Sequence, residues 1–336
     1  MTRTTPPRPL DVVSLFPELA ARARTATRLH PRPGDPTVHD SSVGGPLLWP
    51  EDEAWPTCGD EHEPYGLTTL EDVRTRRRIL AAAWQRPTPP GTNLLTPDEK
   101  VVVDRVDSGY DPALLPVEPL PLIPLAQLYA RDVPDLPCPP GTDMLQVLWC
   151  PFDEIMDARS AVRLRWRQST SVRNLLMHPP EPAFVGQGCY VPEPCVLHPE
   201  QVTEYPAYHE LDDKLAERII SRERELLQSP DEKQPSYRGD LSIAPGWKVG
   251  GWAAFFTFRS PAGPDELRCC GAPLEPLLTI PSDEWDGDSR SWRPIITEED
   301  ESVDHTPTQV EIGRGYTLQV YRCTASQEHP PVTIMQ

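Results

Sequence analysis

The residues with the clearest chemical potential are cysteines and histidines in two short segments. The first segment, C-G-D-E-H, separates Cys58 and His62 by three residues, and the second, L-R-C-C-G, carries Cys269 and Cys270 side by side. Zinc binds thiolate and imidazole groups in tetrahedral sets of four. Adjacent cysteine side chains normally point apart, so a site needs one of this pair together with distant help from Cys58, His62 or Cys323. We therefore expect no cofactor, and zinc at Cys58, His62, Cys269 and Cys270 is the alternative.

A catalytic cysteine would need a positioned histidine base. Cys195 and His198 lie close together in P-C-V-L-H, but a strand through this segment would place them on opposite faces. The G-x-S-x-G pattern of a serine nucleophile does not occur in the sequence. We assign no catalytic residue, and a metal-dependent or thiol enzyme of unknown substrate is the alternative function.

An acidic segment near the C-terminus suits either calcium or a basic partner, although a solvated loop explains it most simply. S-D-E-W-D-G-D places four carboxylates around Gly287, but the spacing breaks the EF-hand pattern and lacks its terminal glutamate. The formal net charge of −19, from 32 basic and 51 acidic residues, argues against binding of a nucleic acid and fits a basic protein partner.

Tryptophans close to the paired glycines and to the acidic segment could line a groove for such a partner, because aromatic side chains anchor interfaces. Core packing explains most of them equally well. The residues of the partner-binding hypothesis are Asp283, Glu284, Asp286, Asp288, Trp49, Trp55, Trp252 and Trp285.

The composition is that of a globular protein built from short elements. The chain has 336 residues, 38% of them hydrophobic, and 44 prolines, which favour stiff extended connections. It contains no apolar run long enough for a membrane span and no signal-peptide core at its N-terminus. Eight cysteines in a chain of this length do not form a disulfide scaffold. We expect a cytoplasmic protein that does not bind a membrane.

Hydrophobic periodicity predicts a few clear elements. Asp11 begins a helix that extends to about Arg24, and residues 211–228 form the most amphipathic helix of the chain. Residues 162–167 alternate apolar side chains with arginines, which is typical of a half-buried strand. The last residues, 326–336, are expected to be loose.

Three landmarks occur twice in the same order and indicate an internal duplication. They are V-G-G at 43–45 and 249–251, L-x-P-L beginning at Leu122 and Leu274, and L-Q-V-x-x-C beginning at Leu145 and Leu318. The spacing between the first two landmarks differs by 54 residues, about the length of a suspected insertion at 66–118. The paired glycines suit a bulge or tight bend, and we treat them as structural: Gly44, Gly45, Gly250 and Gly251.

These observations predict an α+β fold with few helices, in which two divergent tandem repeats pack mixed or antiparallel sheets against each other. The expected segments are an N-terminal helix and lead-in (1–40), a first repeat with the insertion (41–200), a linking helix (201–240), a second repeat (241–325) and the tail (326–336).

The ordered motifs V-G-G-P-L-L-W-P, P-L-I-P-L-A-Q-L, D-M-L-Q-V-L-W-C, K-V-G-G-W and L-L-T-I-P-S-D-E-W-D-G resemble the YwqG-like family, a bacterial domain family of unknown function. The resemblance covers nearly the whole chain, and residues 18–50, which end with the first motif, look like versions from high-G+C Gram-positive bacteria. It implies an α+β fold with an internal repeat. Relatives often carry a closely spaced cysteine pair after the second G-G, where this chain has Cys269 and Cys270. Some relatives are encoded near secreted toxins, which suggests an immunity or interaction role.

The sequence as a whole favours a non-enzymatic cytoplasmic protein that binds another protein, such as a basic toxin. Neither a nucleic acid nor a membrane is an expected partner. A third interpretation is a structural component of a larger assembly.

Overall fold

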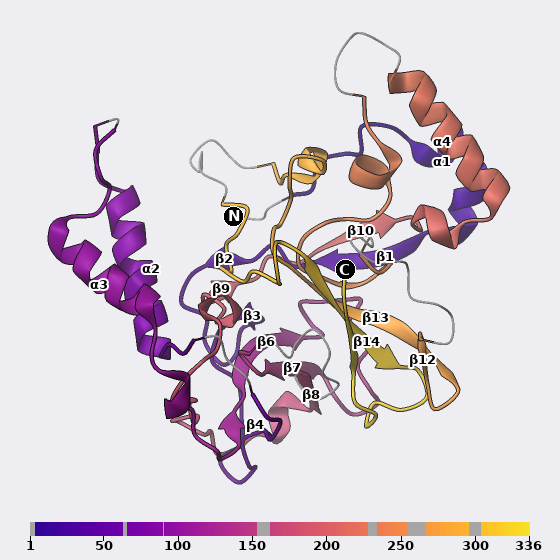
Figure 1. Ribbon diagram of the computed structural model, residues 1–336. Coiled ribbons are helices and arrows are strands. Elements are labelled where there is room, and N and C mark those ends of the chain that lie inside the picture. The colour runs from indigo at the N-terminus through magenta and orange to yellow at the C-terminus, as the bar shows by residue number, and fades with distance from the viewer. Residues whose placement is uncertain are drawn as a thin grey trace.

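The computed structural model describes residues 4–62, 66–89, 91–152, 162–227, 234–254, 266–295 and 304–336. Within these residues the fold is α+β, with few helices and with strands that pair in antiparallel sheets (Figure 1). The expected fold class is thus confirmed, and the antiparallel form is the one observed.

Two large sheets make up the body of the molecule. Sheet 1 has the order β2 (Arg32–Pro33), β9 (Cys195–Val196), β3 (Ser42–Val43), β6 (Ile123–Tyr129), β7 (Met144–Trp149) and β8 (Val162–Arg167). Sheet 2 has the order β10 (Glu200–Glu204), β1 (Arg24–Arg28), β11 (Lys248–Gly250), β13 (Ala272–Pro281), β14 (Thr317–Cys323) and β15 (Val332–Met335), and β12 (Arg268–Cys269) pairs with β13. A separate two-stranded ribbon joins β4 (Thr57–Cys58) to β5 (Leu120–Pro121).

The central strands of the two sheets pair in matching registers. Val43 of β3 lies opposite Ala126, and Val249 of β11 lies opposite Leu278, so each V-G-G valine meets the same position of its L-x-P-L strand. Both of those strands carry a register shift just after the proline, at Pro124 and at Pro276. The duplication stays a prediction, and these registers support it.

The two sheets are joined by a pair of segments that each contribute to both. Residues 24–33 run antiparallel to residues 195–204 in one constant register, from Arg24 opposite Glu204 to Pro33 opposite Cys195. The first half of each segment lies inside one sheet, and the second half forms the edge of the other sheet. The sequence repeats L-H-P where both segments pass from one sheet to the other, at 29–31 and 197–199, and this repeat is not among the three landmarks.

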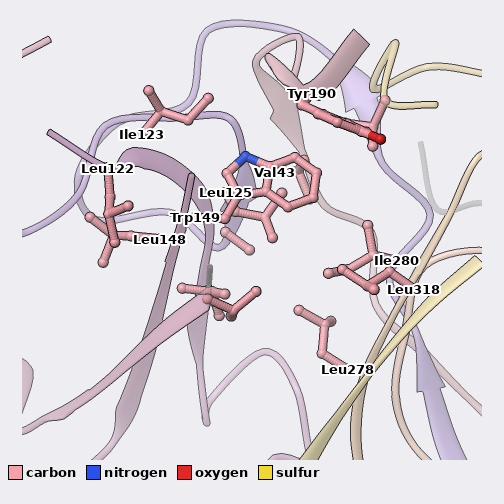
Figure 2. Packing of buried hydrophobic residues seen from close by; sticks show 14 of the residues in the cluster. Val43, Leu122, Ile123, Leu125, Leu148, Trp149, Tyr190, Leu278, Ile280 and Leu318 are labelled. Carbon is pink, nitrogen blue, oxygen red and sulfur yellow. The ribbon is translucent and has the colours of Figure 1, made fainter. Parts of the chain in front are cut away.

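A single hydrophobic core lies between the sheets. Side chains of β3, β6 and β7, such as Val43, Leu125 and Trp149, belong to the same buried cluster as Leu278 and Leu318 of sheet 2 (Figure 2). The two sheets therefore cannot bury their inner faces independently of each other.

The helices lie at the two sides of this sheet assembly (Figure 1). The expected N-terminal helix is short because Pro17 interrupts it: α1 (Val12–Leu15) is capped by Asp11 and gives way to a 3-10 helix. The linking helix is α4 (Asp213–Leu227), as expected. Short 3-10 helices span Pro17–Arg22, Pro112–Leu114, Ser169–Ser171, Gly188–Tyr190, Tyr208–Glu210 and Arg290–Trp292, and a π-helical turn spans Tyr237–Leu241.

The suspected insertion forms a helical pair between β4 and β5. It contains α2 (Leu70–Trp84) and α3 (Pro97–Ser108). Thr96 and Glu99 form a complete capping box at the start of α3. That S/T-x-x-E signature was present in the sequence and predicts a helix start.

The C-terminal tail corrects our expectation of a loose end. Residues 332–335 form β15, which pairs with β14 through four residues and buries Ile334 and Met335. The tail holds its place because strand pairing and apolar burial act on it together. Among the described residues, none of the helices has the length and apolar character needed to cross a membrane.

Candidate metal centres

Four metal-ligating side chains meet at the end of sheet 2. The sulfur atoms of Cys269, Cys270 and Cys323 and a ring nitrogen of His329 all lie within 4.8 Å of one another, and we call them the C-terminal cluster. The Sγ atoms of Cys270 and Cys323 are 3.8 Å apart, and Nδ1 of His329 lies 3.3 Å from Cys323 Sγ and 3.5 Å from Cys269 Sγ. Cys323 is buried, and Cys270 is exposed.

A tight hairpin turn brings the adjacent cysteines together. Cys269 pairs with Ala272, which leaves Cys270 and Gly271 as a two-residue loop, and both loop residues have positive φ (47° and 84°). These values are typical of a type I′ turn. Our expectation that adjacent cysteines diverge applies to an extended strand. The reversal of the chain at Cys270 instead directs both thiols toward the end of β14.

The spacing of the C-terminal cluster matches a tetrahedral zinc site. Zinc–sulfur bonds of about 2.3 Å and a zinc–nitrogen bond of about 2.0–2.1 Å give tetrahedral edges of roughly 3.8 Å between sulfurs and roughly 3.6 Å between sulfur and nitrogen. The separations of 3.8, 3.3 and 3.5 Å in this cluster lie close to these values. Three cysteines and one histidine are also a common ligand set of structural zinc sites.

A second cluster lies at the corresponding end of sheet 1. The ligand atoms of Cys58, His62 and Cys150 lie within 4.8 Å of one another, and Nε2 of His62 is 3.7 Å from Cys150 Sγ. We call them the N-terminal cluster. Both cysteines are buried, and the His62 ring stacks on Phe152 with centroids 4.4 Å apart. The stacking fixes the ring plane and so favours the orientation that points Nε2 at Cys150.

Each cluster contains one thiol with a lowered pKa. A hydrogen bond with His329 lowers the pKa of Cys323 to about 6, while desolvation raises the pKa of Cys269. In the N-terminal cluster, a hydrogen bond with Cys150 lowers the pKa of Cys58 to about 7. A thiolate next to further thiols and an imidazole is the arrangement that a soft divalent metal requires.

The structure divides the expected metal ligands between two places. Cys58 and His62 belong to one cluster, and Cys269 and Cys270 belong to the other, so they do not combine as our sequence interpretation required. Two ligands were not predicted at all, Cys150 and His329. Cys150 could have been found because it ends the same L-Q-V-x-x-C landmark as Cys323, whereas His329 carries no local signal.

The acidic residues of the partner-binding hypothesis differ in exposure. Glu284 is buried and accepts a hydrogen bond from the Trp247 backbone N–H (3.0 Å). Asp286 accepts hydrogen bonds from Ser289 and stabilises a turn, and Asp288 is exposed. Burial raises the pKa of Asp283. The segment thus presents fewer carboxylates to a partner than its sequence suggests, and residues 296–303 of the wider acidic stretch lie outside the described part of the chain.

The four tryptophans of that hypothesis occupy three different environments. Trp49 is fully buried and contacts Trp55, whose ring N–H donates to the Leu122 carbonyl. Trp252 lies under the guanidinium of Arg24 (3.6 Å), and Trp285, which is largely buried, lies near His305. These contacts explain the position of each tryptophan separately. They do not bring the four side chains together in one groove.

The paired glycines allow the chain to pass close to its neighbours. Gly44 and Gly250 have positive φ, and Gly45 lies tightly against Ser42. At Gly251 (φ 69°) a Cβ would lie only 2.3 Å from Glu204 Oε2. A side chain there would displace the Glu204 carboxylate, so the structural role expected of this glycine has a direct steric reason.

The glutamine of each L-Q-V landmark is buried and holds the segment after V-G-G. Gln146 Nε2 donates to the Leu48 carbonyl (2.9 Å), and Gln319 Oε1 accepts from the Ala254 N–H (3.3 Å). Each glutamine thus provides a hydrogen-bond partner for a backbone group of that segment.

Cys195, the cysteine considered as a nucleophile, is buried, and its thiol donates to the Pro307 carbonyl (3.3 Å).

No family model matches this chain, and a comparison with curated proteins found no match.

Proposed function

We propose that this protein binds zinc, and that the C-terminal cluster is a structural Cys3His site. The observation that supports the proposal is the convergence of four ligand atoms at tetrahedral spacing from three separate pieces of chain: the β12–β13 hairpin, the end of β14 and the connection to β15. Four protein ligands leave no coordination position for water or substrate, which is typical of a structural site rather than a catalytic one.

The metal would fasten the edge of sheet 2. Among the described residues, a small apolar cluster with Leu274, Tyr321 and Ile334 at its centre packs beside the ligands. A zinc ion that crosslinks Cys269 and Cys270 to Cys323 and His329 would supply the stability that so small a core lacks.

The test compares the zinc content of wild-type protein with that of a C270S/H329A variant by inductively coupled plasma mass spectrometry. Both substituted side chains are at least partly exposed, so the fold should survive. We expect the variant to bind one zinc fewer per chain. C138S is the matched control, because Cys138 belongs to neither cluster, and it should keep the wild-type content. An unchanged zinc content in C270S/H329A would contradict the proposal.

Alkylation of the exposed Cys270 thiol separates this proposal from a thiol enzyme. Bound zinc should protect Cys270 from iodoacetamide, and a chelator should remove the protection, as read from the modified peptide. Equal modification with and without the chelator would favour a free nucleophile.

An interaction role is a second proposal, supported by the net charge of −19 and by the exposed Asp288. Its test is affinity capture with the wild-type protein and with D288K as baits. We expect a basic protein that wild type captures to be absent from the D288K capture. Glu284 should be left intact because it is buried. E51K, at another exposed carboxylate, is the control. Capture of the same proteins by both charge-reversal baits would rule the role out.

Free cysteines and thiolate ligands fit the reducing cytoplasm, where we place the protein.

A further inference from the structure

We infer that Cys58, His62 and Cys150 form a second zinc site, which keeps one exchangeable coordination position beside a pocket. The inference extends the proposed zinc function but depends on a different set of ligands. Among the residues that the structure describes, three ligand atoms lie within 4.8 Å of one another here rather than four, and the Asp60 carboxylate, with Oδ2 3.7 Å from Cys58 Sγ, is the polar side chain beside the fourth position. Two thiolates and one imidazole with an open fourth position are a known ligand set of reactive zinc sites.

Strand registers show that the first cysteine of each cluster occupies an equivalent place in a two-stranded pairing. Cys58 pairs with Leu120, and Cys269 pairs with Ala272. Leu120 and Ala272 each lie two residues before the leucine that begins the L-x-P-L landmark, at Leu122 and at Leu274. Cys58 in the β4–β5 ribbon and Cys269 in the β12–β13 hairpin therefore occupy equivalent positions relative to that landmark.

The buried cysteine of each cluster is equivalent in the same way. Cys150 and Cys323 both follow L-Q-V after two residues, and the L-Q-V strands pair identically with their neighbours: Val147 with Ala126 and Val320 with Leu278. A chance meeting of thiols would not recur at matching positions in two sheets. The recurrence indicates that both thiol pairs serve one purpose.

The insertion explains why the third ligand differs. In sheet 2, Cys269 and Ala272 are joined by the two-residue turn that supplies Cys270. Between β4 and β5, residues 59–119 stand in place of that turn, and the start of this segment supplies His62 instead. Replacement of one ligand donor by another, rather than its loss, is what selection for metal binding would produce.

The open position would face a pocket whose lining residues indicate which kind of molecule could bind there. Cys58 and His62 line a pocket of about 780 Å³ together with Leu115, Val117 and Leu120. Asp60, Glu61 and Glu118 also line it. These carboxylates disfavour anions, so the site suits a small neutral or cationic molecule with one nitrogen, oxygen or sulfur donor. When bound, zinc would supply Lewis-acid activation of such a donor.

The first test counts zinc in the full chain by native mass spectrometry. We expect two ions in wild type, one in H62A and one in C270S/H329A, with H39A, at a histidine outside both clusters, as the control. If H62A binds as much zinc as wild type, the second site does not exist. If C270S/H329A binds less zinc in the same experiment, the proposal for the C-terminal cluster still holds. If wild type binds no zinc, both fail.

The second test probes the open position with cobalt as a spectroscopic substitute for zinc. In C270S/H329A only the N-terminal cluster would bind Co²⁺, and its sulfur-to-cobalt charge transfer should correspond to two thiolates. Addition of imidazole, a neutral nitrogen donor, should shift the visible cobalt bands. In H62A, where the four-ligand cluster alone is filled, imidazole should change nothing. Cobalt bands of C270S/H329A that do not change with imidazole would mean that a protein ligand such as Asp60 occupies the fourth position, and they would overturn the open position.

Discussion

At the scale of the residue, Cys270 is the most informative position in the molecule. A residue with a Cβ carries a cost of order 1 kcal/mol in the left-handed region, and Asn or Gly normally occupies this place in a type I′ turn. A thiol at φ 47° is unfavourable for the turn alone. It is explained if the thiol is needed where the turn places it, beside Cys323.

This conflict predicts opposite effects of one substitution in two conditions. C270N should raise the free energy of unfolding slightly in the presence of a chelator, because Asn-Gly is the preferred type I′ sequence. With zinc added, wild type should gain stability, and C270N should gain much less, since one ligand is missing. Urea unfolding with and without zinc measures both effects. An equal zinc-dependent gain in the two proteins would contradict the ligand role of Cys270.

A second residue-scale prediction concerns the buried glutamine of sheet 2. Gln319 Oε1 accepts from Thr279 Oγ1 (2.9 Å) and from the Ala254 N–H, and its Nε2 donates to the Leu278 carbonyl (3.1 Å). Q319L deprives the buried Thr279 hydroxyl and Leu278 carbonyl of this partner, so unfolding should cost about 1–3 kcal/mol less. Q85L, at an exposed glutamine, should change stability by no more than about 0.5 kcal/mol. Equal effects of the two substitutions would contradict the stabilising role that we assign to the buried glutamine of the L-Q-V landmark.

At the scale of the element, local patterns predicted some of the structure and failed where distant strands meet. The amphipathic run of α4, the alternation of β8 and the bends at V-G-G were recognisable because each depends on neighbours in sequence. The metal clusters depend on pairing between residues more than fifty positions apart, such as Cys270 and Cys323. No local sequence pattern shows that such distant residues come together. No pattern distinguished the buried Glu284 from the exposed carboxylates of the same segment either.

The cluster between α4 and the π-helical turn predicts a pH dependence. Burial raises the pKa of Tyr208 and of Tyr237, whose hydroxyls donate to Glu223 (2.5 Å) and to the Pro206 carbonyl (2.7 Å). In the unfolded chain tyrosines ionise near pH 10, while in the fold these two stay protonated. Their contribution is therefore complete below about pH 10 and is lost as the pH rises further.

Unfolding in urea between neutral and strongly alkaline pH measures this loss. Wild type should lose stability steeply above about pH 10, and the Y208F/Y237F variant should lose it less steeply, whatever its stability at pH 7. Y110F, at a more exposed tyrosine, should keep the wild-type slope. Identical slopes in all three proteins would show that these hydroxyls ionise normally in the fold.

At the scale of the whole molecule, the two sheets are held together by the exchanged segments 24–33 and 195–204. Glu204 at the edge of sheet 2 reaches across β1 to Lys248 of β11, and both side chains are fully buried, with Nζ and Oε1 2.5 Å apart. Glu204 also accepts the backbone N–H groups of Ala244 and Trp252. The pair thus fixes where the second exchanged segment enters its sheet.

Removal of one partner of this pair should be costly. K248M leaves the Glu204 carboxylate buried and uncompensated, so we expect a loss of about 3–5 kcal/mol in the free energy of unfolding. K248M/E204Q removes the charge and keeps an acceptor for the backbone, and it should recover part of the loss. Urea unfolding of the three proteins measures both steps. A loss below about 1 kcal/mol in K248M would mean that the pair is accessible to water.

The measurement that tests the central claim most directly is zinc K-edge X-ray absorption of H62A, in which the C-terminal cluster alone would bind metal. We predict a first shell of three sulfurs at about 2.3 Å and one nitrogen at about 2.0–2.1 Å. The chain is rich in carboxylates, and adventitious zinc on them would show oxygen and no sulfur. A sulfur-free first shell, or no bound zinc, would contradict the assignment of Cys269, Cys270, Cys323 and His329 as a metal centre.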